Sequence, residues 1–216
     1  LSSLRETIAA HYERAYGVQI DSARIAITAG ASGALLLAMA ALVESGDEVL
    51  LPDPSYPCNR HFVTAFDGIA RLVPCGPEVR YQLDAAAVSA QWMPRTRGVM
   101  LASPSNPTGT SITADTLKAL LDATRVRGGF AVVDEIYQGL VYDHPPSSAL
   151  ALASDVLVIN SFSKYFDMTG WRLGWLVLPE PLVQAVERLA QNLFICASTV
   201  AQRAALACFD EDSLQI

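Results

Sequence analysis

The sequence predicts an α/β domain, a three-layer α/β/α sandwich with a mostly parallel sheet and one antiparallel strand. Short runs of β-branched residues alternate with helical patterns along the whole chain, which is typical of strands joined by covering helices. No repeat, low-complexity run or linker interrupts this alternation. A chain of 216 residues is long enough to bury roughly 70% of its unfolded surface. We therefore expect one domain over residues 1–216.

The glycines and prolines between the runs set the expected order of elements. An amphipathic helix is expected from Leu4 to Tyr16, opened by a capping box in Ser3–Glu6 and stopped by Gly17. The second strand is expected to break at Pro52. Strands are expected at residues 24–28, 48–51, 70–73, 98–102, 130–133, 156–160 and 173–178, with helices between most of them and further helical segments from residue 181.

The last strand, from Leu173 to Leu178, is expected to run against its neighbours. Only about a dozen residues without a helical pattern separate it from the strand before it, and a parallel crossover normally needs at least that many residues and a helix. The short connection therefore predicts the one antiparallel strand of the sheet.

Composition and charge exclude several classes of protein. The formal net charge is −7, from 15 basic and 22 acidic residues, which argues against nucleic acid as a partner. No apolar run reaches the length of about 18 residues that a membrane-spanning helix needs. The histidines are isolated, so we expect no metal site. We expect a cytoplasmic protein with reduced, mostly buried thiols, because the cysteines form no paired motif: Cys58, Cys75, Cys196 and Cys208.

Chemically useful residues follow four of the predicted strands. In open α/β sheets, ligands bind outside the carboxyl ends of the strands. The segments that follow these ends are Gly30–Gly33, Ser103–Gly109, Asp134–Tyr137 and Ser161–Lys164. One edge of the sheet is therefore expected to collect a glycine turn, an amide, a carboxylate, a phenol, two hydroxyls and a lysine.

The glycine turn at Gly30–Gly33 could bind an anion. It offers free backbone N–H groups at the start of a helix, where the helix dipole favours negative charge. Such a turn is equally common as a simple connection between a strand and a helix that binds no ligand. The hydroxyls of Ser161 and Ser163 and the guanidinium of Arg172 could close on the same anion, which favours a phosphate site.

Lys164 is one of only two lysines in the chain, and the other, Lys118, lies in a helix that is expected to be exposed. Lys164 follows a buried strand and is expected to be desolvated among Phe162, Phe166 and Trp171. Desolvation makes a lysine amine a nucleophile toward carbonyl groups. The alternative is an ordinary surface lysine whose stem packs on apolar side chains.

Asp134 closes the apolar strand at residues 130–133 and is expected to be nearly buried. A buried carboxylate is either paired or protonated. Helix capping or a structural arginine would be the ordinary explanation. Its place on the same sheet edge as Lys164 points instead to a cationic ligand, such as a protonated pyridine nitrogen.

Four blocks of the sequence together resemble a known family. Ser161–Lys164 followed by Gly170–Gly174 resembles the lysine signature of the class I/II aminotransferases, which are fold type I enzymes dependent on pyridoxal 5'-phosphate (PLP). Ser105–Gly109 and the pair Asp134 and Tyr137 resemble two further blocks of that family, in the same order. The resemblance covers nearly the whole chain and implies the large, PLP-binding domain of such an enzyme.

The resemblance also implies roles around the cofactor ring. Lys164 would form the Schiff base with PLP and then move the proton between substrate and cofactor. Asp134 would pair with the pyridine nitrogen, and Asn106 and Tyr137 would hydrogen-bond the phenolic oxygen. Tyr56 resembles the aromatic residue that stacks on the ring, although on residues alone it could equally pack against its own turn.

A second set of roles concerns the phosphate group of PLP. The resemblance implies that this group is bound by the backbone and side chains of Ala31, Ser32, Ser161 and Arg172, with Ser163 as a further contact. Catalytic roles are thus expected for Lys164, Asp134 and Tyr137, and no metal is expected to take part.

The resemblance implies amino acid and 2-oxo acid substrates and a homodimer. Family members also carry an N-terminal segment and a C-terminal small domain, whose arginine grips the substrate carboxylate. Neither is recognised in this sequence, which begins at Leu1 with a helix and is expected to end at Ile216 without a closing element. We therefore expect a truncated large domain that is inactive on its own.

Other functions fit the sequence less well. A nicotinamide-dependent enzyme would want G-x-G-x-x-G after a strand, and only G-x-x-G is present at Gly30–Gly33. The S-x-x-K pattern at Ser161–Lys164 lacks the S-D-N and K-T-G motifs of penicillin-binding enzymes. A non-catalytic domain would not be expected to keep Lys164, Asp134 and Arg172. A PLP-dependent lyase, decarboxylase or synthase on the same fold stays open as the alternative to an aminotransferase.

Overall fold

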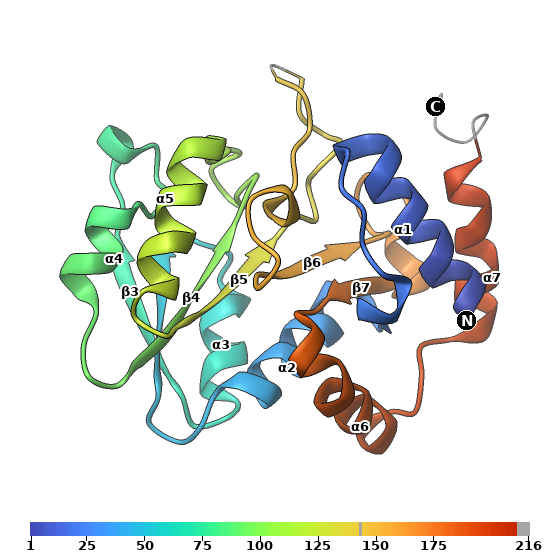
Figure 1. The fold of residues 1–216 in the computed structure, drawn as a ribbon, viewed down its shortest axis with the longest axis horizontal. Helices are drawn as coiled ribbons and strands as arrows, with labels where there is room; N and C mark the ends of the chain where they lie inside the picture. Colours follow the sequence, from blue (N-terminus) through green and yellow to red (C-terminus); the bar gives the residue numbers. More distant parts are fainter. Residues whose placement is uncertain (143, 211–216) are drawn as a thin grey trace.

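A seven-stranded sheet runs through the molecule in the order β1-β7-β6-β5-β4-β2-β3 (Figure 1). The computed structural model describes residues 1–142 and 144–210. β7 pairs antiparallel with β1 and β6, and the remaining neighbours are parallel. The antiparallel direction expected for the last strand is confirmed. The strands are β1 (Ile25–Thr28), β2 (Glu48–Asp53), β3 (Ile69–Pro74), β4 (Thr96–Ala102), β5 (Phe130–Asp134), β6 (Leu157–Ser161) and β7 (Gly174–Val177).

Helices cover both faces of this sheet, so the expected three-layer sandwich is confirmed (Figure 1). One apolar core lies between the sheet and the helices α1, α4, α5 and α7, and the other lies between the sheet and α2, α3 and α6. The α-helices are α1 (Ser2–Tyr16), α2 (Gly30–Leu42), α3 (Cys58–Thr64), α4 (Ala85–Gln91), α5 (Ala114–Arg125), α6 (Val183–Leu193) and α7 (Thr199–Ala205).

The central strands supply both cores because their side chains alternate between the faces. In β5, Ala131 and Val133 pack into the core on the α5 side, and Val132 packs into the core on the α2 side. β6 alternates in the same way. Strands that are buried on both faces have continuous apolar sequences, which is why these strands could be predicted from the sequence.

Helix α1 buries Leu4, Ile8 and Tyr12, which lie four residues apart on one face. It ends at Gly17, which adopts the left-handed conformation with φ 67°. The predicted capping box is wrong. The helix begins at Ser2, so the residue Ser3 lies inside the first turn instead of at the N-cap, and no side chain caps this end.

Strand β2 continues through Pro52, although a break was expected there. Its pairing with β4 covers only the first half of the strand, up to Leu50 opposite Val99. Its pairing with β3 extends to Asp53 opposite Pro74. A proline lacks the backbone N–H, but beyond Leu50 the side of β2 that faces β4 forms no ladder that would need it.

The four cysteines are free thiols, as expected. The expectation that most are buried is wrong, because Cys75 is buried whereas Cys196 is exposed and the other two are half-buried. Among the described residues, no group of three or more histidine, cysteine or acidic side chains is placed to hold a metal ion. In the same part of the chain, no helix is both long and apolar enough to cross a membrane. The expectation about Ile216 lies outside the described residues.

Candidate active site

All of the predicted site residues line one pocket at the carboxyl edge of the sheet. β1, β4, β5 and β6 run in the same direction, so their carboxyl ends meet at this edge. The pocket has a volume of about 200 Å³. It brings together the predicted residues Ala31, Ser32, Tyr56, Asn106, Asp134, Tyr137, Ser161, Ser163, Lys164 and Arg172.

One end of the pocket is a cup for an anion at the start of α2. No side chain of the described residues caps this helix, which leaves its first-turn N–H groups without a side-chain acceptor there. Ser161 Oγ donates to the Leu173 carbonyl at 3.0 Å and lies 2.9 Å from Ser163 Oγ, within hydrogen-bond distance. Arg172 Nη1 lies 3.5 Å from Ser163 Oγ and donates to the Thr169 carbonyl at 2.8 Å. Helix dipole, hydroxyls and guanidinium therefore converge as phosphate binding requires.

Two glycines allow the close packing of this cup. Gly30 has φ +71°, and a Cβ at this position would lie 2.7 Å from Arg172 Nη2. Gly174 lies in β7 where the strand passes the start of α2, and a Cβ there would lie 2.7 Å from the Gly30 carbonyl carbon and 2.8 Å from the Asn160 oxygen. Both positions therefore need glycine for the backbone and the guanidinium to approach each other.

Asp134 lies at the end of β5 with only 8% of its surface exposed. Burial raises the pKa of its carboxyl group to about 6, although the Ile136 backbone N–H, which donates to Oδ1 at 3.0 Å, lowers it. Among the described residues, no basic side chain lies within ion-pair distance of Asp134. The expected burial is confirmed, and the carboxylate faces the pocket without a counter-ion.

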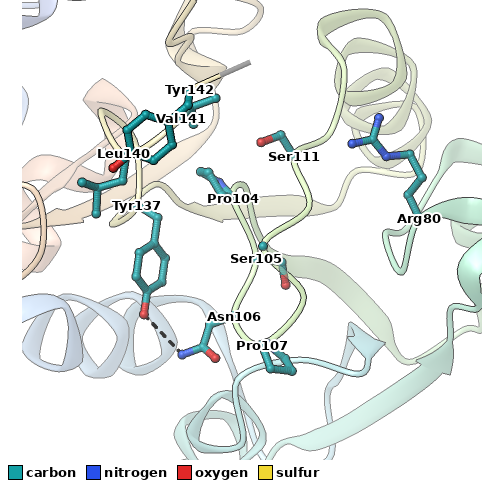
Figure 2. Close-up of a pocket in the computed structure, with 11 residues that line it drawn as sticks. Arg80, Pro104, Ser105, Asn106, Pro107, Ser111, Tyr137, Leu140, Val141 and Tyr142 are labelled. Carbon is teal, nitrogen blue, oxygen red and sulfur yellow. Dashed lines mark hydrogen bonds between the residues drawn. The ribbon is translucent and has the colours of Figure 1, made fainter. Parts of the chain in front are cut away.

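Asn106 and Tyr137 form a pair on the wall of the pocket. Asn106 Nδ2 donates to Tyr137 Oη at 3.3 Å (Figure 2). Asn106 lies in the loop after β4, and Tyr137 lies in the turn after β5. The pair joins two neighbouring strand ends and presents an amide and a phenol to the same space.

Lys164 is exposed, so the prediction that burial desolvates it is wrong. Phe162 is fully buried and packs on Phe166 and Trp175, as the turn after β6 folds back onto the core. Trp171, which was expected to help cover the lysine, is 47% exposed. Lys164 is the third residue after β6, and its side chain enters the pocket, where its Nζ lies 5.9 Å from the centre of the Tyr137 ring.

Tyr56 lies on the pocket rim between β2 and α3, and 41% of its surface is exposed. Sequence reasoning missed four other lining residues, of which three are apolar. The fourth, Thr169, donates its hydroxyl to the Ser163 carbonyl and so holds the serine turn. Its position just before the Gly170–Arg172 block was the only available signal. The missed residues are Leu35, Ala102, Ile136 and Thr169.

A larger depression of about 480 Å³ lies next to the Asn106–Tyr137 pair (Figure 2). Leu140, Val141 and Tyr142 form part of its wall. The paired residues belong to both spaces. The site is thus a small pocket that opens beside a wider surface hollow.

The chain belongs to the class I and II aminotransferase family, because the model of that family matches residues 1–216. It is 41% identical over 218 residues to a valine–pyruvate aminotransferase of Mycobacterium tuberculosis, covering 99% of this chain and 55% of that protein. It is 37% identical to a probable N-succinyldiaminopimelate aminotransferase of the same species, covering 97% of this chain and 55% of that protein.

Solved structures show the same likeness. A crystal structure of an aminotransferase from Mycobacterium tuberculosis matches with a TM-score of 0.96 at 40% identity, covering all of this chain and 56% of that one. A putative aminotransferase from Silicibacter pomeroyi matches with a TM-score of 0.93 at 45% identity, covering all of this chain and 58% of that one. The chain thus spans little more than half the length of the relatives that it matches.

Proposed function

We propose that these 216 residues form the large, cofactor-holding domain of a PLP-dependent aminotransferase. One observation carries the proposal: a single pocket joins the Lys164 amine, the unpaired Asp134 carboxylate and the anion cup at the start of α2. PLP carries an aldehyde, a pyridine nitrogen and a phosphate, and each of these groups finds a partner of matching chemistry there.

The buried Asp134 carboxyl supports the fit best. Burial raises its pKa to about 6, and no basic side chain of the described residues lies within ion-pair distance to offset this. A protonated pyridine nitrogen would offset the free-energy cost of burying the charged carboxylate by pairing with it. The anion cup supports the fit of the phosphate group of PLP, because Gly30 leaves room for the Arg172 guanidinium beside the start of α2.

PLP, when bound, supplies an electron sink for bonds to the substrate α-carbon. Around it we assign the roles that the family resemblance implies. Lys164 carries the cofactor and moves the proton at the α-carbon, and Asp134 keeps the pyridine nitrogen protonated. Asn106 and Tyr137 hold the phenolic oxygen, while the Tyr56 ring covers the cofactor face.

The remaining phosphate contacts come from the cup. We assign the backbone N–H groups of Ala31 and Ser32, the hydroxyls of Ser161 and Ser163 and the guanidinium of Arg172 to this group, which explains why these groups converge. Arg172 is used there, and among the residues that the structure describes Lys164 is the only other basic residue lining the pocket. The arginine that binds a substrate carboxylate would come from outside this chain, so we expect the 216 residues alone to bind PLP weakly and not to transfer amino groups.

The substrates and the assembly that we propose are those that the family resemblance implies. We propose an amino acid and a 2-oxo acid as substrates and a homodimer as the working assembly. The share of the relatives' length that the chain covers supports a second, smaller domain in the working enzyme. The free thiols support the cytoplasmic location that was expected from the sequence.

The test of this function uses the longer enzyme that we propose. Amino donors are screened against pyruvate and 2-oxoglutarate, and Asp134→Ala is compared with the wild type. We expect turnover to fall at least about 100-fold, which is roughly 3 kcal/mol in the barrier, while PLP still binds. A variant with near-normal turnover would show that Asp134 is a structural carboxylate, and no transfer from any donor in the wild type would refute the proposed reaction.

A further inference from the structure

A separate, smaller cavity lies on the α5 side of the sheet, next to the turn that carries Asp134 and Tyr137. Its volume is about 110 Å³. Asp134 faces the candidate active site, and the next residue, Glu135, faces this cavity instead. Gln138 also lines it, among apolar side chains such as Leu117. The proposed function gives these two polar residues no role.

In Glu135 and in Gln138, only one of the two polar side-chain atoms has a hydrogen-bond partner among the described residues. Glu135, 1% exposed, accepts hydrogen bonds on Oε1 from the Ala149 N–H at 2.6 Å and from Ser148 Oγ at 3.2 Å. Gln138, 6% exposed, donates from Nε2 to the Ser103 carbonyl at 3.0 Å. Glu135 Oε2 and Gln138 Oε1 are both buried and have no hydrogen-bond partner among the described residues. Two unpartnered acceptors therefore share one cavity, where a hydrogen-bond donor is missing.

The charges around Glu135 favour its neutral form. No basic side chain of the described residues lies within ion-pair distance of it. The titratable groups that act on it or share its surroundings are Asp134 on its own strand end and Tyr12 and Tyr16 on α1. Burial first, and then the neighbouring Asp134, raise the pKa of Glu135 to about 8, although the bonds from Ala149 and Ser148 lower it. A carboxyl group with its proton also supplies the missing donor.

We propose that Glu135 is a positioning residue that keeps its proton in the folded protein and shares it with Gln138, directly or through one water. The cavity is large enough for such a water, which needs at least about 10–15 Å³. The unit links three segments through Ser103, Ala149 and the turn itself.

The links explain how the unit would act on the active site. Ser103 begins the loop that carries Asn106, and Gln138 directly follows Tyr137. The backbone N–H of Gln138 also donates to the Glu135 carbonyl at 2.9 Å, which closes the turn. The unit thereby fixes the two segments whose side chains meet in the 3.3 Å contact between Asn106 and Tyr137. This last consequence rests on the proposed function; the proton on Glu135 does not.

The first experiment compares Glu135→Gln with the wild type in urea unfolding without cofactor, from pH 5 to pH 9. The folded wild type binds the proton more tightly than the unfolded chain, so its stability falls as the pH rises between about 4.5 and about 8. Glutamine keeps the donor and has no proton to lose. The ratio of folding constants, variant over wild type, is expected to rise about tenfold per pH unit between pH 5 and pH 8.

Ser148→Ala is the matched control, because it removes one bond to Oε1 but leaves the acid and should keep the wild-type pH slope. A Glu135→Gln chain that is less stable than the wild type throughout pH 6–9 would mean an ionised carboxylate with another donor and would overturn the proposal. If the variant does not fold, infrared spectra of the wild type decide. A protonated carboxyl band present at pH 7 and lost above pH 9 supports the proposal, and its absence at pH 7 refutes it.

The positioning role has its own readout in the visible band of bound PLP. Gln138→Leu cuts the link to Ser103 while keeping a side chain of similar length, and it is expected to shift the pH midpoint of that band. Ser148→Ala is expected to leave the midpoint in place. An unchanged midpoint in Gln138→Leu would refute positioning. If the wild type shows no band with PLP, the proposed function fails, while the urea and infrared results still decide whether Glu135 holds its proton.

Discussion

Replacing Gly30 by alanine tests whether the Arg172 guanidinium binds the phosphate of the cofactor. Gly30 has φ +71°, and a side chain in this left-handed region costs about 1–2 kcal/mol. The new Cβ would also lie 2.7 Å from Arg172 Nη2. Ordinary contact needs about 3.5 Å, so the guanidinium must move by about 1 Å. Its 3.5 Å approach to Ser163 Oγ would then be lost.

The expected loss is one charge-assisted hydrogen bond to the phosphate, about 1.5–3 kcal/mol. This corresponds to PLP binding that is about 10- to 100-fold weaker. The assay is a titration of the visible absorbance with PLP, run in parallel with pyridoxal, which lacks the phosphate. Gly30→Ala should weaken PLP binding and leave the affinity for pyridoxal unchanged.

Gly17→Ala provides the matched control. Gly17 has φ +67°, but a Cβ there would have no atom within 4 Å. Both variants should lose about the same stability from backbone strain, about 1–2 kcal/mol, and only Gly30→Ala should lose preference for PLP over pyridoxal. Equal PLP affinities in the two variants would show that the guanidinium does not bind the phosphate.

Two further predictions concern stability without cofactor. Burial raises the pKa of Asp134 from 3.8 to about 6. The free energy of unfolding therefore falls by about 3 kcal/mol as the pH rises through that window. Asp134→Asn should therefore be more stable than the wild type at pH 7, as measured by urea unfolding, and lower stability there would reveal a structural partner for the carboxylate. Leu120→Ala removes a fully buried side chain and should cost about 2–5 kcal/mol. Leu193→Ala, at a position 60% exposed, should stay within about 0.5 kcal/mol, and equal losses would contradict the assigned core.

Those parts of the fold that depend on a single clear sequence feature, such as an apolar run or a short connection, could be predicted. The apolar runs of β5 and β6 are continuous because both faces of these strands are buried. The direction of β7 followed from a connection too short for a crossover helix. The start of α1 could not be predicted, because two further residues could join the helix and move Ser3 out of the capping position.

The gathering of these residues in one pocket was predictable from the sequence, but the burial and hydrogen-bond partners of each were not. Residues that follow parallel strands meet at one sheet edge whatever the details, so Asn106, Asp134 and Lys164 were placed together correctly. Whether a side chain three residues past the sheet is covered depends on tertiary packing, and Lys164 proved to be exposed. The unpartnered oxygens of Glu135 and Gln138 needed coordinates, because the sequence does not show which buried acceptors lack a donor.

Borohydride reduction shows whether this chain carries PLP on Lys164. The chain is incubated with PLP, reduced, digested and mapped by mass spectrometry. Only two lysines are present, so Lys118, which lies outside the pocket and pairs with Asp122 at 2.5 Å, serves as the internal control. We expect a pyridoxyl group on Lys164 alone. A label on Lys118, or on neither lysine, would contradict it.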